Sequence, residues 1–285
     1  MNRRDFLATS SAALLAGTAL ADGPKKPKLR LAVKYGMIKG KGTTLDKFEL
    51  AKKVGFEGVE IDSPSGLNRR AAVRAQELTG VRIHGVIDSI HWGQPLSSPD
   101  AGIRAEGLAG LQTALDDAKF VGADTVLLVP GVVNKDVSYD QCWERSQAEV
   151  RKALPLAEKN NVKIAIEVVW NNFLTKPSQL IEYVDQFQSP FVGAYFDCSN
   201  MIKYGVPPAD WIRQLGKRMF KFDFKGYSHA RQWVPIGEGD ENWPEIVKAL
   251  GEIGYDGWAT AEVDGGGETE LRDVYVRMRK CLELG

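Results

Sequence analysis

The chain has 285 residues, of which 44% are hydrophobic and 26% are charged. These values are close to the average of globular proteins, so neither a disordered chain nor a fibre is indicated. Lysine plus arginine and aspartate plus glutamate number 37 each, which gives a formal net charge of zero. Because a neutral chain lacks the broad positive field that attracts nucleic-acid phosphates, we expect no nucleic-acid partner.

The first residues predict a targeting signal that does not belong to the fold. Residues 2–7 (Asn-Arg-Arg-Asp-Phe-Leu) resemble the twin-arginine consensus, residues 7–20 are small and apolar, and residues 19–21 (Ala-Leu-Ala) match the cleavage rule. We therefore expect a twin-arginine-type signal peptide over residues 1–21, a linker over 22–28, and export of the folded protein to the periplasm or beyond the cell. The alternatives are a short helix of the mature domain or a membrane anchor. A segment this poor in large apolar residues is a weak membrane span, and we expect no stable membrane insertion once it is removed.

From residue 29 to residue 285 the sequence alternates short apolar strands with amphipathic helices, eight times over. This alternation predicts parallel strands joined by right-handed crossovers. Ser138 is suited to cap a helix, and Gly80 and Gly122 can end helices just before the next strand. The competing architecture, an open doubly wound sheet, is disfavoured because no G-x-G-x-x-G pattern follows the first strand. We predict an α/β fold with one domain, a (β/α)8 TIM barrel, which usually needs roughly 250 residues. The expected strands are Leu31–Tyr35, Gly58–Asp62, Val81–Asp88, Thr125–Pro130, Val162–Val169, Val192–Asp197, Met219–Phe224 and Trp258–Val263.

Acidic side chains close four of the expected strands, namely Glu167, Asp197, Asp223 and Glu262. In (β/α)8 barrels the reacting groups lie at the C-terminal ends of the strands. Four carboxylates that meet in one barrel mouth repel each other unless a cation neutralises them. An all-oxygen ligand set favours Mn²⁺ or Mg²⁺ over zinc. The sequence thus predicts a site for one divalent metal ion.

The alternative is that each carboxylate is neutralised separately. Helix N-termini can donate hydrogen bonds to single carboxylates, and basic side chains can pair with them. The basic residues available for such pairs are Lys225, Lys34 and Arg231.

Five segments, which include the four acidic residues, carry a resemblance to a known family. From about Leu31 to Leu284 the chain is similar to the xylose isomerase-like sugar isomerase/epimerase superfamily, which also contains inosose dehydratases and endonuclease IV. In that superfamily the metal ligands are a Glu on strand 5, an Asp on strand 6, a His on strand 7 in an H-x-K-D pattern, and a Glu on strand 8. The resemblance thus assigns the four ligands to Glu167, Asp197, Asp223 and Glu262. The segments are Ala165–Glu167, Tyr195–Asn200, Lys221–Lys225, Ile236–Asp240 and Gly257–Glu262.

The sequence departs from the family pattern in two motifs. Asp223 stands where the family has its His ligand, and Gly226 stands where the pattern has its Asp. The D-x-x-H pattern that follows strand 6 in sugar epimerases ends here in Asn200. Because Asp can ligate a metal and Asn can bind a sugar hydroxyl, we expect binding to survive. A shell of four carboxylates leaves the ion less Lewis-acidic, which puts the inherited activity in question.

The resemblance implies a metal-dependent sugar isomerase or epimerase that acts on a ketose or keto-sugar through an enediolate. Glu167 and Glu262, on opposite faces of the sugar, would be the catalytic base and acid. The same enediolate can expel a leaving group, so the alternative is a lyase or hydratase of 3-keto-glycosides, or an inosose-type dehydratase. A second alternative, supported by the Asp223 substitution, is a non-catalytic sugar-binding barrel. An abasic-site endonuclease is disfavoured because its zinc cluster needs several histidines, and this chain has three.

The expected partner is a small-molecule carbohydrate, which an exported enzyme would meet in unphosphorylated form. The loop after strand 3 offers Trp92 as a ring that can stack on a sugar, although packing at the barrel rim is an equal alternative. A homo-oligomer is compatible with the sequence. Which sugar is bound, which metal is used, and whether the reaction is isomerisation or elimination stay open. The expected substrate-binding residues are His91, Trp92, Asn200, Lys225, His229 and Arg231.

Overall fold

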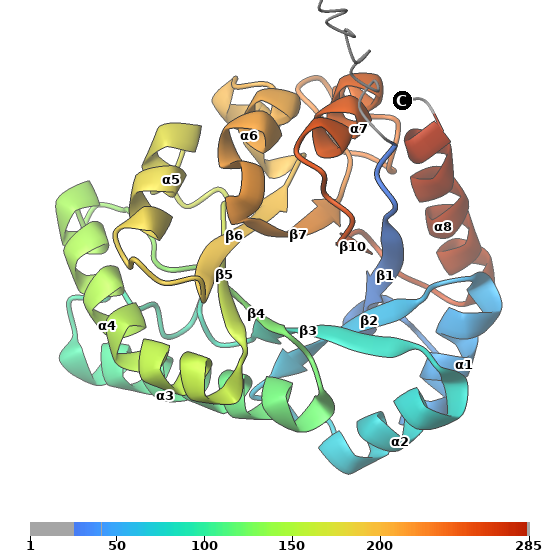
Figure 1. The fold of residues 1–285 in the computed structure, drawn as a ribbon, viewed down its shortest axis with the longest axis horizontal. Coiled ribbons are helices and arrows are strands. Elements are labelled where there is room, and N and C mark those ends of the chain that lie inside the picture. Colours follow the sequence, from blue (N-terminus) through green and yellow to red (C-terminus); the bar gives the residue numbers. More distant parts are fainter. Residues whose placement is uncertain (1–25, 41, 284–285) are drawn as a thin grey trace, which may run out of the picture.

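The computed structural model describes residues 26–40 and 42–283. The expected signal peptide and residues 22–25 of the expected linker therefore lie outside the described residues. Eight parallel strands close into a barrel in the order β1-β10-β7-β6-β5-β4-β3-β2, and the helices form a ring around it (Figure 1). The prediction of a single-domain (β/α)8 barrel is confirmed. The barrel strands are β1 (Arg30–Lys34), β2 (Gly58–Ser63), β3 (Arg82–Asp88), β4 (Thr125–Leu128), β5 (Lys163–Glu167), β6 (Val192–Asp197), β7 (Met219–Phe224) and β10 (Trp258–Ala261).

Five of the helices that surround the barrel begin after a side chain that accepts a free N–H group of the first turn. Before α4 (Tyr139–Asn160), the Ser138 hydroxyl accepts the N–H of Gln141 and the Gln141 side chain accepts the N–H of Ser138. This reciprocal pair confirms the predicted cap and fixes where the helix starts. The helices of the ring are α1 (Thr44–Val54), α2 (Arg69–Thr79), α3 (Ala101–Val121), α4 (Tyr139–Asn160), α5 (Pro177–Asp185), α6 (Pro208–Leu215), α7 (Trp243–Glu252) and α8 (Glu268–Glu283).

Successive residues of a strand point to opposite faces, so each barrel strand serves two environments. Phe196 packs outward in the large core between strands and helices, where its ring stacks on Trp211 of α6 at 5.8 Å. Tyr195 points into the barrel, where it forms a small second cluster with Leu127 and Ala165. The barrel interior is thus lined partly by apolar residues and partly by the polar groups described below.

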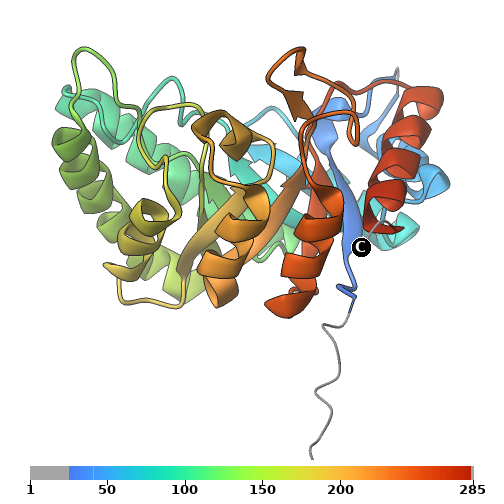
Figure 2. The ribbon, with the colours of Figure 1, turned by 90° about the horizontal axis from the view of Figure 1, so that it is seen from above.

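A short antiparallel hairpin, which the sequence did not predict, interrupts the loop after β7. Its strands are β8 (Tyr227–Ser228) and β9 (Gln232–Trp233). Figure 2 shows this loop in orange on the face that carries the C-terminal ends of the strands, close to the start of α8. The hairpin therefore belongs to the rim of the barrel mouth.

Among the described residues, none of the helices has both the length and the apolar character needed to cross a membrane.

Candidate metal centre

Four carboxylates from neighbouring strands meet at the C-terminal end of the barrel. Glu167 ends β5, Asp197 ends β6, Asp223 lies in β7 next to Asp197 in the register, and Glu262 directly follows β10. One oxygen atom of each residue lies within 4.8 Å of the corresponding oxygens of the others. Three of the residues are buried, whereas the Glu262 side chain is 36% exposed. The expectation that these residues converge is confirmed, and the group can hold a metal ion.

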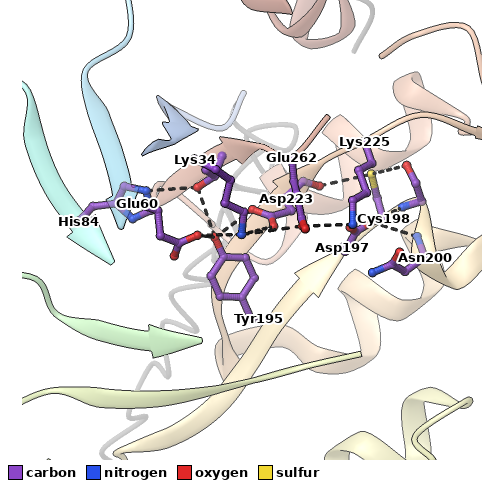
Figure 3. Close-up of polar contacts among 12 residues, drawn as sticks. Lys34, Glu60, His84, Tyr195, Asp197, Cys198, Asn200, Asp223, Lys225 and Glu262 are labelled. Atoms are coloured by element: carbon purple, nitrogen blue, oxygen red, sulfur yellow. Dashed lines mark hydrogen bonds and ion pairs between the residues drawn. The ribbon is translucent and has the colours of Figure 1, made fainter. Parts of the chain in front are cut away.

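Two lysines lie among these carboxylates (Figure 3). The Lys34 Nζ is 3.0 Å from Asp223 Oδ2 and 3.8 Å from Glu262 Oε2. The Lys225 Nζ is 3.0 Å from Asp197 Oδ2 and 3.1 Å from Glu262 Oε2. Three of the four carboxylates therefore have a lysine as ion partner. This is part of the alternative that the sequence left open, in which basic side chains neutralise the carboxylates.

Glu167 differs from the other three. Within the described chain its carboxylate has neither an ion pair nor a hydrogen bond, and its Oε1 atom is buried without a partner. The oxygens of Asp197, Asp223 and Glu262 that face the lysines also lack a well-aligned hydrogen bond. With Glu60, which shares Lys34 with Asp223, five carboxyl groups surround two ammonium groups, so acidic side chains outnumber basic ones in this group. The donor set, composed only of oxygen, therefore fits a hard divalent ion.

The surroundings give the two glutamates opposite protonation tendencies. Burial, reinforced by the charge of Glu262, raises the pKa of Glu167 to about 8. Burial also acts against ionisation of Glu262, but the ammonium groups of Lys34 and Lys225 outweigh it and lower that pKa to about 2. At neutral pH and without a metal, Glu167 thus carries a proton and Glu262 is an anion, the asymmetry that a pair of acid and base catalysts requires.

Asp223 is held by groups from β6, which pairs with β7, and from β1, which lies beyond β10. The Tyr195 hydroxyl donates to Asp223 Oδ1 at 2.9 Å, and Lys34 faces Oδ2. Lys34 also donates to Glu60 Oε2 at 2.8 Å, and that oxygen is 3.2 Å from the Tyr195 hydroxyl. The negative charge that Asp223 introduces in place of a neutral His is therefore balanced by a lysine from β1.

From its sequence, Lys34 was expected only as a possible ion partner, and neither Glu60 nor Tyr195 was expected in the site. The signal that could have found them is a charged residue on an inward-pointing position of an apolar strand. Lys34 and Glu60 both occupy such positions, and both are buried.

The residues expected to bind the substrate occupy different environments. His91 is buried, and its Nδ1 atom accepts the N–H of Val129 at 3.4 Å. Trp92 is 54% exposed and contacts the His91 ring edge-on at 5.6 Å. Asn200 is buried, and its side-chain amide donates to the Val168 carbonyl at 3.2 Å. Of these three, Trp92 is the side chain most open to solvent.

The remaining expected contacts lie after β7. Lys225 lies within the carboxylate group, whereas His229 and Arg231 lie in the exposed turn of the hairpin. Arg231 pairs there with Glu238 at 3.5 Å and donates to its carbonyl oxygen at 2.6 Å. The structure thus brings Lys225 into the candidate centre and leaves His229 and Arg231 on the rim.

The fold and the acidic barrel mouth define a (β/α)8 protein with an oxygen-rich candidate metal centre. Residues 48–282 match the family model described as xylose isomerase-like TIM barrel, and the chain belongs to this family. The family suggested by the sequence motifs is therefore confirmed.

The chain is also similar to individual proteins. The L-ribulose-5-phosphate 3-epimerase UlaE of Escherichia coli (strain K12) is 26% identical over 268 residues, which cover 83% of this chain and 90% of that protein. A solved D-tagatose 3-epimerase-like protein superposes with a TM-score of 0.79 at 20% identity, over 90% of this chain and 98% of that one. The 3-keto-D-glucoside 4-epimerase YcjR from E. coli gives a TM-score of 0.75 at 15% identity, over 89% and 99%. The similarity to these two structures is one of fold.

Proposed function

We propose that this protein is a metal-dependent sugar isomerase or epimerase that acts on a ketose or keto-sugar. The observation that carries the proposal is the convergence of Glu167, Asp197, Asp223 and Glu262 at the catalytic end of the barrel. The similarity to UlaE, a sugar epimerase, supports it. The same four residues would hold the ion, Mn²⁺ or Mg²⁺. When bound, such an ion would act as a Lewis acid that acidifies the C–H next to the substrate carbonyl.

The two glutamates divide the proton transfers. Glu262, kept anionic by Lys34 and Lys225, is the base that removes the proton from the carbon next to the carbonyl. The electron pair of the broken C–H bond moves to the carbonyl oxygen and gives an enediolate. Glu167 returns a proton, which it takes up from solvent, to the opposite face of the same carbon. Removal on one face and return on the other inverts the carbon, and solvent then resets both carboxyl groups.

Exchange of the substrate proton with solvent tests this function. The Mg²⁺-loaded protein is incubated in D₂O with ketoses and 3-keto-glycosides, and the substrates are followed by NMR. Deuterium at the carbon next to the carbonyl, without bond cleavage, is the expected result. Release of the aglycone would instead identify the lyase alternative. If neither exchange nor cleavage is detected, the proposal is overturned and the sugar-binding barrel remains.

A pair of matched variants makes the exchange experiment specific. Glu262→Gln keeps the size of the side chain but cannot remove the proton, so the exchange rate should fall at least about a hundredfold. Glu49→Gln makes the same change on the exposed surface of α1 and should leave the rate unchanged.

We also propose that residues 1–21 direct export through the twin-arginine route, to the periplasm or beyond. The support is the motif around Arg3 and Arg4. Replacing both arginines with lysine should retain the protein in the cytoplasm, as measured by cell fractionation. Unchanged export of the double variant would contradict the proposal.

A further inference from the structure

A large cavity adjoins the carboxylate group on one side. Its volume is ≈ 790 Å³, within the range typical of small-molecule sites. Lys225 and Glu262 line it together with residues of the hairpin loop after β7 and of α8. A sugar that touches Glu262 would therefore have this cavity beside it, and any substituent on that side of the sugar would enter it.

The walls of this cavity are mostly apolar. One wall is the segment Trp233, Val234, Pro235 and Ile236, and Val274 of α8 also lines the cavity. The Trp233 ring stacks on Trp170 at 4.9 Å and meets Tyr227 edge-on at 5.2 Å, yet half of its surface stays exposed. Aromatic neighbours thus hold in place a ring that still has surface available to a ligand.

The charges around the cavity disfavour a phosphate group. In many (β/α)8 barrels a phosphate binds between the loops after strands 7 and 8 and a helix N-terminus, which is where this cavity lies. Here the first turn of α8 carries Glu268 and Glu270, and Glu270 lines the cavity together with Asp264 and Asp273. These carboxylates repel an anion and counteract the favourable end of the helix dipole.

The two cations that line the cavity already have partners. Arg277 lies 2.6 Å from Asp273 and 2.8 Å from Glu238. Lys225 lies between Asp197 and Glu262. Among the described lining residues, neither basic group is left to neutralise a phosphate.

We propose that the substrate is an unphosphorylated keto-glycoside whose aglycone is uncharged and apolar. The aglycone occupies the cavity against Trp233 and Val274, while the keto-sugar faces Glu262. This inference rests on the proposed function, because it assumes that the sugar lies at the carboxylates. It adds the uncharged, apolar aglycone, which the names of the similar proteins do not specify.

Binding of simple glucosides tests the inference without turnover. The probes are phenyl β-D-glucoside, methyl β-D-glucoside and glucose 6-phosphate, titrated into the Mg²⁺-loaded full chain by calorimetry. The phenyl glucoside should bind at least about tenfold more tightly than the methyl glucoside, a difference of about 1.4 kcal/mol. Glucose 6-phosphate should bind no more tightly than the methyl glucoside.

Variants locate the preference within the cavity. Thr269 is an exposed lining residue, so Thr269→Trp should fill the cavity. Trp233→Ala removes part of the apolar wall. Each change should weaken binding of the phenyl glucoside at least about fivefold relative to the methyl glucoside. Phe120→Ala is the matched control, because Phe120 is an aromatic residue with 47% of its surface exposed that does not line this cavity. It should leave the ratio of the two affinities unchanged.

Several results would overturn the inference. They are equal affinity for the two neutral glucosides, tighter binding of glucose 6-phosphate, no measurable binding of the phenyl glucoside, or an unchanged affinity ratio in both cavity variants. Deuterium exchange into a free ketose, measured on the same preparation, separates this failure from failure of the proposed function. Exchange without a preference for the phenyl glucoside overturns only the inference about the aglycone. A preference for the phenyl glucoside without exchange overturns the proposed isomerase function but supports an apolar aglycone in the cavity.

Discussion

Asp223 is fully buried, and the surrounding residues bind each of its two oxygens separately. Tyr195 donates to one oxygen and the Lys34 ammonium faces the other. Removing one partner of such a buried pair leaves an uncompensated charge, which costs more than the pair itself contributes. At the scale of single residues, Lys34 thus has two opposing effects, because it stabilises the metal-free protein and competes with a cation for the same carboxylates.

Replacing Lys34 with Met should reveal both effects. Because Asp223 and Glu60 lose their counter-charge, the free energy of unfolding of the metal-free protein should fall by about 3 kcal/mol, measured by urea denaturation. Mn²⁺ should bind roughly tenfold more tightly, because a positive charge near the ligands is gone. Lys53→Met is the control, since Lys53 is 64% exposed and its pair with Glu268 lies on the surface. Weaker Mn²⁺ binding by the Lys34 variant would show that the lysine does not compete with the ion.

Metal binding should depend on pH through Glu167. Burial raises the pKa of this side chain to about 8, so below that pH a metal ion must displace its proton. The affinity for Mg²⁺ should therefore rise with pH, by up to about tenfold per unit below pH 8, and level off above it. Calorimetry between about pH 6 and 8.5 measures this profile. The Glu167→Gln variant should bind Mg²⁺ more weakly, and its affinity should no longer show the pH dependence that the Glu167 proton causes. A flat profile for the unaltered protein would contradict the assignment.

At the scale of elements, the hairpin of β8 and β9 shapes one side of the barrel mouth, and its fit to β7 depends on Gly226. A Cβ atom at this position would lie 2.5 Å from the Val234 carbonyl oxygen and 2.6 Å from that of Pro235. The N–H of Val234 donates to the Gly226 carbonyl at 2.9 Å. The backbone of the returning loop lies directly against Gly226. This close approach is a structural reason for a glycine where the family pattern has an Asp.

Gly226→Ala should push the returning loop away from β7. We expect the free energy of unfolding to fall by about 1–3 kcal/mol, since backbone atoms must move to admit the methyl group. Limited proteolysis should show faster cleavage between residues 229 and 236. Gly36→Ala provides the comparison, because nothing lies within 4 Å of the added methyl group there. Equal behaviour of the two variants would mean that the close approach does not hold the loop.

At the scale of the whole molecule, local sequence patterns were enough to predict the barrel. The strands Val192–Asp197 and Met219–Phe224 were predicted with the bounds that the structure shows, because each is a run of buried residues that ends in a change of polarity. The last barrel strand was predicted to reach Val263 but ends at Ala261. The hairpin was not predicted, because strands of two residues carry no hydrophobic periodicity.

The candidate centre was predictable only in part for a similar reason. An acidic residue that closes an apolar strand is visible in the sequence, and Glu167 and Asp197 were found in this way. The approach of Lys34 to Asp223 is not visible, because the two lie in strands that barrel closure brings together across β10. Local patterns therefore located the ligands, while their ion partners depend on the closed structure.

The central claim is that four carboxylates share one divalent cation in the barrel mouth. Anomalous diffraction at the manganese edge, from crystals grown with Mn²⁺, tests it most directly. The account predicts one Mn²⁺ peak bonded to oxygens of Glu167, Asp197, Asp223 and Glu262, with the ammonium groups of Lys34 and Lys225 displaced from between them. A barrel mouth without a manganese peak, with both ammonium groups still placed among the carboxylates, would contradict it.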